Sequence, residues 1–103
     1  MPKFSNSCNV VNCKQKLSKN ELVRAIRFNI AAEYEAIQLY QQVVESTDNE
    51  FVKTVLTDIA NEEKEHAGEL LKVLVELDKE EADFYKKGAK EVDELKKENN
   101  LKE

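Results

Sequence analysis

Two runs of mostly apolar residues, whose members recur at alternating steps of three and four, constrain the fold of this chain more than any other feature. The first run is Val23, Ile26, Ile30, Glu33, Ile37, Tyr40 and Val44, and the second is Val52, Leu56, Ile59, Glu63, His66, Leu70, Val73 and Leu77. This spacing puts the side chains on one face of a helix that packs against another helix. With only 2 glycines and 1 proline in 103 residues, the chain has too few turn-forming residues of these two types for a sheet protein. The sequence predicts an all-α domain.

Local signals set the expected helix ends. A capping box, Ser18 with Glu21, starts a first helix from Lys19 to Glu45. Turn-forming residues 46–49 follow, and Thr47 with Glu50 predicts a second capping box. The second helix then runs to Leu77. Because short connections join antiparallel neighbours, we expect a helical hairpin.

A shorter third helix is expected after this hairpin. Asp78 with Glu81 gives its cap, and Gly88 is where the helix could end or weaken. The expected organisation is a flexible N-terminal tail over residues 1–17, one helical domain over 18–93, and a charged tail over 94–103 that is frayed helix or disorder.

Three polar residues, Glu33, Glu63 and His66, interrupt the apolar runs. Glu33 lies 15 residues before Asp48 and Glu63 lies 15 after it. With a rise of ~1.5 Å per residue, both sit roughly 22 Å from the turn and face each other across the hairpin. His66 lies one turn from Glu63 on the same face.

Burying these carboxylates without partners is costly, and no Lys or Arg occurs between Phe28 and Val52. A bound cation solves the problem, and carboxylate oxygen with imidazole nitrogen suits iron, manganese or zinc. The alternative is a polar layer that only fixes the register of the helices.

The number of ligands predicts how many chains form the site. A di-iron centre in a four-helix bundle uses one Glu from each of two helices and a Glu-x-x-His from each of the other two. One chain supplies one lone Glu and one Glu-x-x-His, with His66 the only histidine. Two chains supply the full set, with four negative charges to match two Fe²⁺ ions. We therefore expect a homodimer that forms a four-helix bundle around the metals.

Charge and hydropathy limit the expected binding partners and the expected cellular location. The net charge of -5 argues against nucleic acid and anionic membranes, and no apolar run is long enough to cross a bilayer. No signal peptide is visible, so a cytoplasmic location is expected. Cys8 and Cys13 could form a metal or redox pair, but the second pair of a structural zinc or rubredoxin-like site is missing.

The stretches Ile-Ala-Ala-Glu-Tyr-Glu-Ala-Ile-Gln-Leu-Tyr (30–40) and Asn-Glu-Glu-Lys-Glu-His-Ala (61–67) resemble the encapsulated ferritin family. The resemblance covers roughly residues 22–77. It implies a ferritin-like fold with Glu33, Glu63 and His66 as ferroxidase ligands, Tyr40 beside the centre, and Glu35 in a secondary site where iron is taken up. It also implies a di-iron cofactor, which zinc, manganese or calcium can replace, and homodimers that assemble into decameric rings inside encapsulin shells.

Two departures from that family stand out. Ala32 occupies a position where some members carry another acidic residue, and residues 98–103 show no apolar peptide for targeting to a shell. The expected function is ferroxidase activity for iron storage or detoxification, with the oxidised iron passed to an encapsulin compartment. The alternatives are a rubrerythrin-like di-iron peroxidase and a non-catalytic metal-binding helical dimer.

Overall fold

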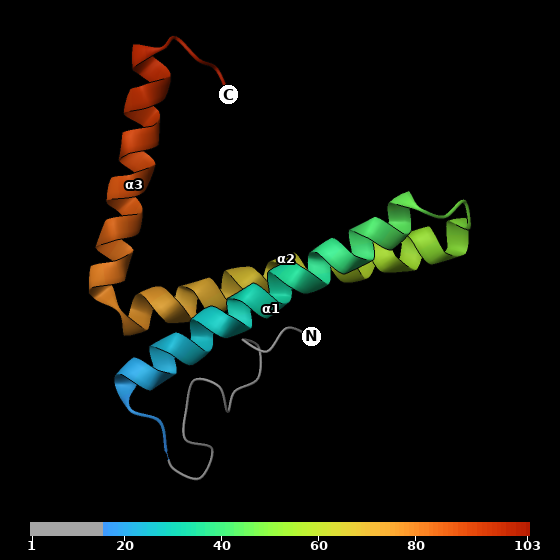
Figure 1. Ribbon diagram of the computed structural model, residues 1–103, viewed down its shortest axis with the longest axis horizontal. Helices are drawn as coiled ribbons and strands as arrows, with labels where there is room; N and C mark the ends of the chain where they lie inside the picture. Colours follow the sequence, from blue (N-terminus) through green and yellow to red (C-terminus); the bar gives the residue numbers. More distant parts are fainter. Residues whose placement is uncertain (1–15) are drawn as a thin grey trace.

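The computed structural model describes residues 16–103, and their regular structure is three helices. These are α1 (Lys19–Glu45), α2 (Glu50–Leu77) and α3 (Lys79–Glu98). α1 and α2 lie antiparallel along most of their length, and α3 leaves the end of the hairpin at a steep angle (Figure 1). The bounds predicted for the two long helices are confirmed. The predictions for the N-terminal tail, Cys8 and Cys13 concern positions outside the described residues, apart from the last two residues of that tail.

The caps of the hairpin explain where its helices start. The Ser18 hydroxyl accepts the backbone N–H of Glu21, and the Glu21 carboxylate accepts that of Ser18, which confirms the first capping box. The predicted Thr47–Glu50 box is wrong. Asn49 caps α2 by accepting the Val52 N–H at 3.1 Å, so Glu50 is the first helical residue and cannot occupy the third position.

Helix α3 is longer than the sequence suggested. Its cap is confirmed, because the Asp78 carboxylate accepts the Glu81 N–H at 2.9 Å. Gly88 neither ends nor bends the helix, since an exposed glycine inside a helix costs only about 1 kcal/mol. The helix ends at Glu98, and just beyond it Asn100 takes a positive φ of 55° while the Leu101 N–H bonds the Lys96 carbonyl. Residues 94–98 are therefore helical, and nothing interrupts the helix at residue 93.

The core of the hairpin is narrow. Its buried side chains come at seven-residue intervals, and they are Val23, Ile30 and Ile37 from α1 with Ala60, Ala67 and Leu74 from α2. The α1 residues belong to the predicted run, but those of α2 form a second stripe beside it. Alanine lets the two backbones approach closely, so the α2 stripe that includes Ala60 faces α1. The run that includes Glu63 and His66 lies at the edge of the hairpin.

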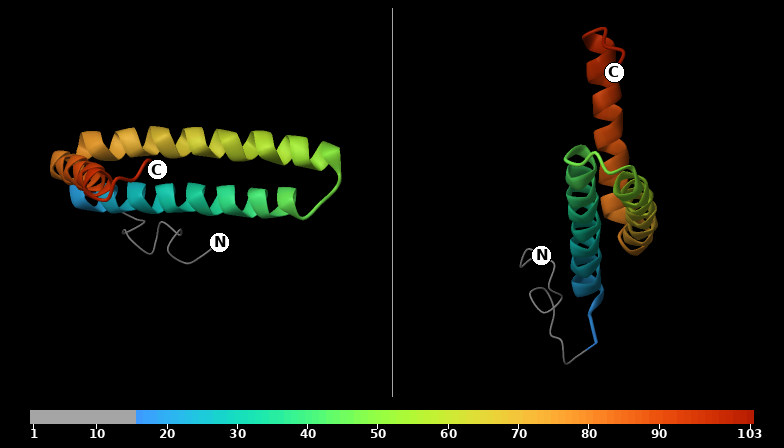
Figure 2. Two further views of the ribbon diagram at one scale, coloured as in Figure 1. Left: turned by 90° about the horizontal axis from the view of Figure 1, so that it is seen from above. Right: turned by 90° about the vertical axis from the view of Figure 1, so that its right-hand side faces the viewer.

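Large apolar side chains remain exposed on all three helices. Val73 of the second run is 44% exposed, and α3 has no buried residue. The right-hand view of Figure 2 shows α3 projecting away from the hairpin. A single hairpin with this much uncovered apolar surface is typical of a subunit rather than a complete folding unit. Within residues 16–103, no helix has the combination of length and apolar character that membrane crossing requires.

Candidate metal centre

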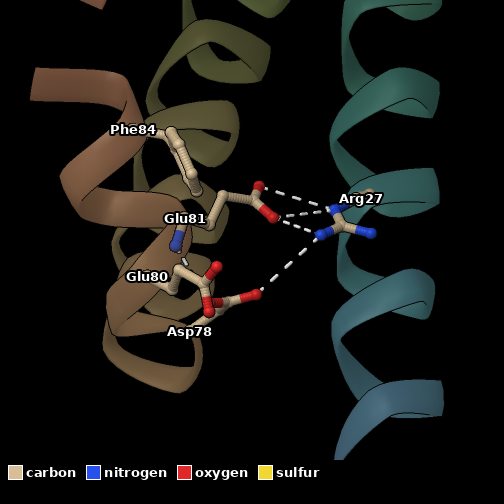
Figure 3. Close-up of a pocket in the computed structure, with 5 residues that line it drawn as sticks. All are labelled: Arg27, Asp78, Glu80, Glu81 and Phe84. Atoms are coloured by element: carbon tan, nitrogen blue, oxygen red, sulfur yellow. Dashed lines mark hydrogen bonds and ion pairs between the residues drawn. The ribbon is translucent and has the colours of Figure 1, made fainter. Parts of the chain in front are cut away.

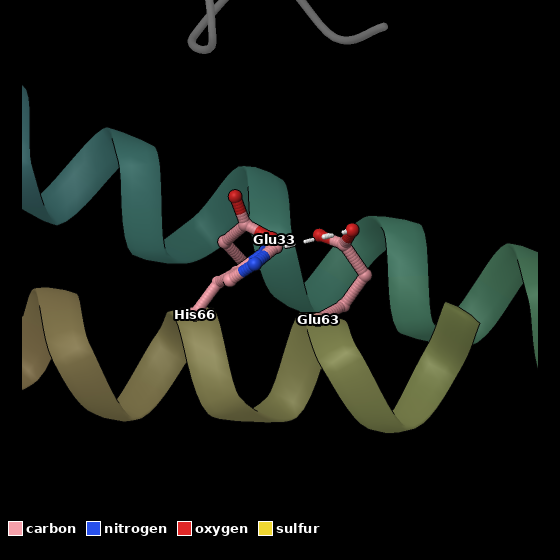
Figure 4. A group of neighbouring side chains, drawn as sticks. All are labelled: Glu33, Glu63 and His66. Carbon is pink, nitrogen blue, oxygen red and sulfur yellow. Dashed lines mark ion pairs between the residues drawn. The ribbon is translucent and has the colours of Figure 1, made fainter. Parts of the chain in front are cut away.

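Glu33 from α1 and Glu63 and His66 from α2 converge at the middle of the hairpin, as Figure 4 shows. The Nδ1 atom of His66 lies 3.7 Å from an oxygen of Glu33 and 3.7 Å from an oxygen of Glu63. One ligand atom from each residue lies within 4.8 Å of the others. Two ligands that each lie about 2.1 Å from a shared ion are separated by about 3–4 Å, so the cluster matches the size of a metal site.

The donor atoms also fit a cation chemically. The Oε2 atom of Glu33 is buried and has no hydrogen-bond partner. A buried carboxylate oxygen in this state is costly unless a positive charge compensates it. Lys64, the nearest lysine in sequence, lines a different cavity with Gln41 and Thr57. Within the described residues, no ion pair with a lysine or arginine involves Glu33 or Glu63, and a metal ion would supply the missing charge.

The cluster lies on the open edge of the hairpin. The side chains of Glu33 and Glu63 are 24% and 20% exposed, whereas that of His66 is 49% exposed. Two carboxylates and one imidazole do not fill the coordination sphere of an octahedral metal ion. The uncovered half therefore leaves room for further ligands from outside the chain.

Tyr40 and Glu35, the other two predicted site residues, are not part of this cluster. Tyr40 is half-buried and lies seven residues after Glu33, on the same side of α1. Glu35 lies two residues after Glu33, so its side chain points to another side of the helix, where its Oε2 atom is also buried without a hydrogen-bond partner. Their roles at a metal centre stay predictions.

One cluster of charged residues was missed from the sequence. Arg27 of α1 binds Glu81 of α3 and lies 3.9 Å from an oxygen of Asp78. From their positions in the sequence, Asp78 and Glu81 are recognisable only as a helix cap. Nothing in the local pattern identified Arg27 as their partner, because 54 residues separate it from Glu81.

Comparison with known proteins supports a ferritin-like fold. Residues 25–103 match the family model described as Rubrerythrin. The crystal structure of the encapsulated ferritin domain from Pyrococcus furiosus superposes with a TM-score of 0.79 at 39% identity, covering 84% of this chain and 89% of that one. The all-α, ferritin-like fold class is confirmed.

Two curated relatives carry names that concern encapsulins. A ferritin-like-encapsulin shell fusion protein of Pyrococcus furiosus is 40% identical over 86 residues, which are 84% of this chain and 25% of that protein. The encapsulin nanocompartment cargo protein EncC of Myxococcus xanthus is 43% identical over 68 residues, 66% of this chain and 52% of that protein. The chain thus spans about a quarter of one relative and about half of the other.

Proposed function

The chain belongs to the encapsulated ferritin family, within the ferritin-like di-iron proteins matched by the Rubrerythrin model, and on this premise we propose that it is a ferroxidase. Its substrate would be Fe²⁺, and the product Fe³⁺ would pass to storage or detoxification. The observation that carries the proposal is the convergence of Glu33, Glu63 and His66 around one point at the open edge of the hairpin.

The ligand chemistry favours oxidation of the substrate. Anionic carboxylate oxygens are hard ligands that stabilise Fe³⁺ more than Fe²⁺, so Glu33 and Glu63 lower the free energy of the product. His66 adds a neutral nitrogen ligand and leaves the charge unchanged. Two Fe²⁺ ions release two electrons, which with two protons reduce one dioxygen to hydrogen peroxide. Apolar neighbours such as Ile30 and Ile37 keep one side of the site dry.

A second copy of the chain would complete the centre. Two copies supply four carboxylates and two histidines, and their charge of -4 equals that needed by two Fe²⁺ ions. Pairing the open edges would also cover half-exposed residues such as Val73. We therefore place the site at a homodimer interface with a four-helix bundle around it. Assembly of the dimers into a decameric ring follows from the family resemblance.

The named relatives suggest where the reaction takes place. One relative is fused to an encapsulin shell and the other is a nanocompartment cargo protein. By extension, this chain would work inside an encapsulin shell in the cytoplasm. Co-expression with an encapsulin shell protein, followed by purification of the particles, tests this assignment, and particles that lack the chain contradict it.

Aerobic oxidation of Fe²⁺, followed by the ultraviolet absorbance of Fe³⁺, tests the activity. The substitutions Glu33→Ala, Glu63→Ala and His66→Ala should each abolish most of the rate. Glu62→Ala is the matched control, because Glu62 neighbours Glu63 but is exposed and outside the cluster. If all three site variants oxidise iron at the wild-type rate, the assignment is wrong. If the wild-type protein binds iron without oxidising it, a non-catalytic metal-binding role replaces the proposal.

The Rubrerythrin match over residues 25–103 favours one further candidate, a di-iron peroxidase. Such an enzyme would use the same three residues to reduce peroxide with electrons from a partner protein. Consumption of peroxide in the presence of a chemical reductant separates the two. Rapid turnover of peroxide, with slow oxidation of Fe²⁺ by dioxygen, would favour the peroxidase.

A further inference from the structure

The junction between α2 and α3 is a single residue. α2 ends at Leu77 and α3 begins at Lys79, so only Asp78 between them leaves the helical conformation, with φ -128° and ψ 91°. No glycine or proline enforces this bend. Asp78 could also adopt helical torsions, in which case α2 and α3 would merge into one long helix. The direction of α3 therefore depends on contacts that favour the bent form.

Beyond the junction, α3 makes few contacts that could favour the bent form. The helix has no buried residue, and large side chains such as Phe84, Val92 and Leu95 are each more than half exposed. The contact that reaches back to α1 is a cluster of four side chains at the corner, Arg27, Asp78, Glu81 and Tyr85. We name it the corner clamp, and Figure 3 shows Arg27 extending from α1 toward its carboxylates on α3.

The corner clamp engages both oxygens of Glu81. Arg27 donates from Nε to Oε1 at 3.1 Å, and its Nη2 also donates to Oε1. The hydroxyl of Tyr85 donates to Oε2. Asp78 adds an ion pair to Arg27 at 3.9 Å while its carboxylate also caps α3. Every member of the clamp except Arg27 lies at the junction or in the first two turns of α3.

This arrangement differs from an ordinary surface ion pair. Exposed pairs contribute little because solvent screens them and two long side chains must be ordered. Here the Arg27 side chain is 49% exposed but that of Glu81 is only 13% exposed, and the forked guanidinium meets a carboxylate that also accepts a hydrogen bond from Tyr85. The Arg27 hydrogen bond, followed by that of Tyr85, lowers the pKa of Glu81, so the pair remains charged at neutral pH.

We propose that the corner clamp is a conformational lock that holds α3 at its angle to the hairpin against merging with α2. With the lock closed, Asp78 caps α3 and the exposed apolar side chains of α3 project to one side of the hairpin. With the lock open, Asp78 becomes helical and α3 swings toward the axis of α2. Arg27 is thus a positioning residue for α3, and it belongs to a face of α1 other than that of Glu33.

The distance between nitroxide labels on α1 and α3 measures the angle directly. Labels are attached at Gln38 and Glu94, which are both exposed, in a chain whose Cys8 and Cys13 are replaced by serine. Mixing with excess unlabelled protein removes the signal from pairs of labels on different copies. Pulsed electron paramagnetic resonance should give one narrow distribution for the intact clamp, because α3 has a single direction.

Glu81→Gln removes the charge but keeps the shape of the side chain. It should broaden the distribution and add a population at longer distance, as expected when α2 and α3 merge. Arg27→Lys, which keeps the charge but loses the fork, should do the same to a smaller extent. Glu50→Gln is the matched control, since it breaks an exposed pair with Lys53 far from the corner and should leave the distribution unchanged.

Far-ultraviolet circular dichroism shows whether each variant keeps its helices. Narrow, wild-type distributions in both Glu81→Gln and Arg27→Lys would overturn the proposal, because the direction of α3 would then be set by the junction alone. If Glu81→Gln loses helical content, Arg27→Lys decides the matter, since its smaller change leaves the Asp78 cap in place.

Discussion

Replacing Glu33 by glutamine should stabilise the metal-free protein while it removes iron oxidation. Glutamine keeps the size of the side chain and removes its charge. In the absence of metal, Glu33 and Glu63 are two like charges at the edge of an apolar core, and an oxygen of Glu33 is buried without a hydrogen-bond partner. The neutral amide ends this repulsion, and its NH₂ group can donate to Glu63.

The size of the effect follows from the separation of the two carboxylates. At the 4.8 Å limit of the cluster, and with an effective dielectric constant of about 20, two unit charges repel by about 3 kcal/mol. The side chains are 24% and 20% exposed, so solvent screening reduces the net gain to about 1 kcal/mol. For a domain of this size, that corresponds to a rise in Tm of about 4–8 °C.

Thermal unfolding followed by circular dichroism measures this gain, with a chelator present and at one fixed protein concentration, because assembly also affects stability. Glu62→Gln, an exposed change in the middle of α2, is the control and should shift Tm by less than Glu33→Gln does, because an exposed substitution changes stability by no more than about 0.5 kcal/mol. Added Mn²⁺ should stabilise the wild type but not Glu33→Gln. Since loss of groups that merely support metal ligands costs about 10–100-fold, iron oxidation should fall by at least that much.

The opposite sign would refute this reasoning. If Glu33 belonged to a polar layer that only fixes the register of the helices, its contact with His66 would stabilise the metal-free hairpin. Glu33→Gln would then lower Tm in the presence of chelator, and Mn²⁺ would have no effect on the wild type. The two interpretations therefore predict shifts in opposite directions for the same pair of samples.

Three further predictions concern stability and titration. Leu74→Ala should cost about 2–5 kcal/mol in urea unfolding because Leu74 is 1% exposed, whereas Leu71→Ala, at a position 39% exposed, should cost clearly less. The hydrogen bond to Glu81, followed by burial, raises the pKa of Tyr85 from 10.0 to about 12, so its contribution to stability is complete below pH 10 and is lost as the pH rises to 12. An ultraviolet titration should show a tyrosinate component near pH 12 that disappears in Tyr85→Phe. Asn100→Gly should raise the helical content of α3 slightly, because glycine adopts the φ of 55° without strain.

The sequence predicted the hairpin because its signals are local. Ser18 and Glu21 form a cap within one turn, and the alternating steps of three and four continue through both helices without a break. The convergence of Glu33 with Glu63 and His66 could be predicted for the same reason. An antiparallel hairpin with a short connection fixes which residues lie at equal height, so two positions at equal distances from Asp48 must meet.

The buried stripe of α2 could not be predicted in this way. Both the run through Glu63 and the stripe of Ala60, Ala67 and Leu74 have helical spacing, and the sequence does not say which one faces α1. The choice depends on how closely the two backbones approach, which is a property of the pair of helices. In the hairpin, the small stripe packs against α1, and this leaves the run with Glu63 at the open edge.

The corner between α2 and α3 also contains a feature that the sequence alone could not predict, because it depends on residues far apart in the chain. Asp78 with Glu81 predicts a cap, because Asp is preferred at the first position before a helix, but the pattern does not give the direction in which the new helix leaves. Glu81 comes within reach of Arg27 only when the chain bends at Asp78, and that contact favours the bend together with the Asp78 cap. The cap of Asp78 with Glu81 thus predicted the break between the helices, but the direction of α3 depends on a partner 54 residues away and could not be predicted. A pair of this kind is a lock rather than a consequence of local propensity, and its removal should let Asp78 become helical, so that α3 continues the axis of α2 instead of starting anew at Lys79.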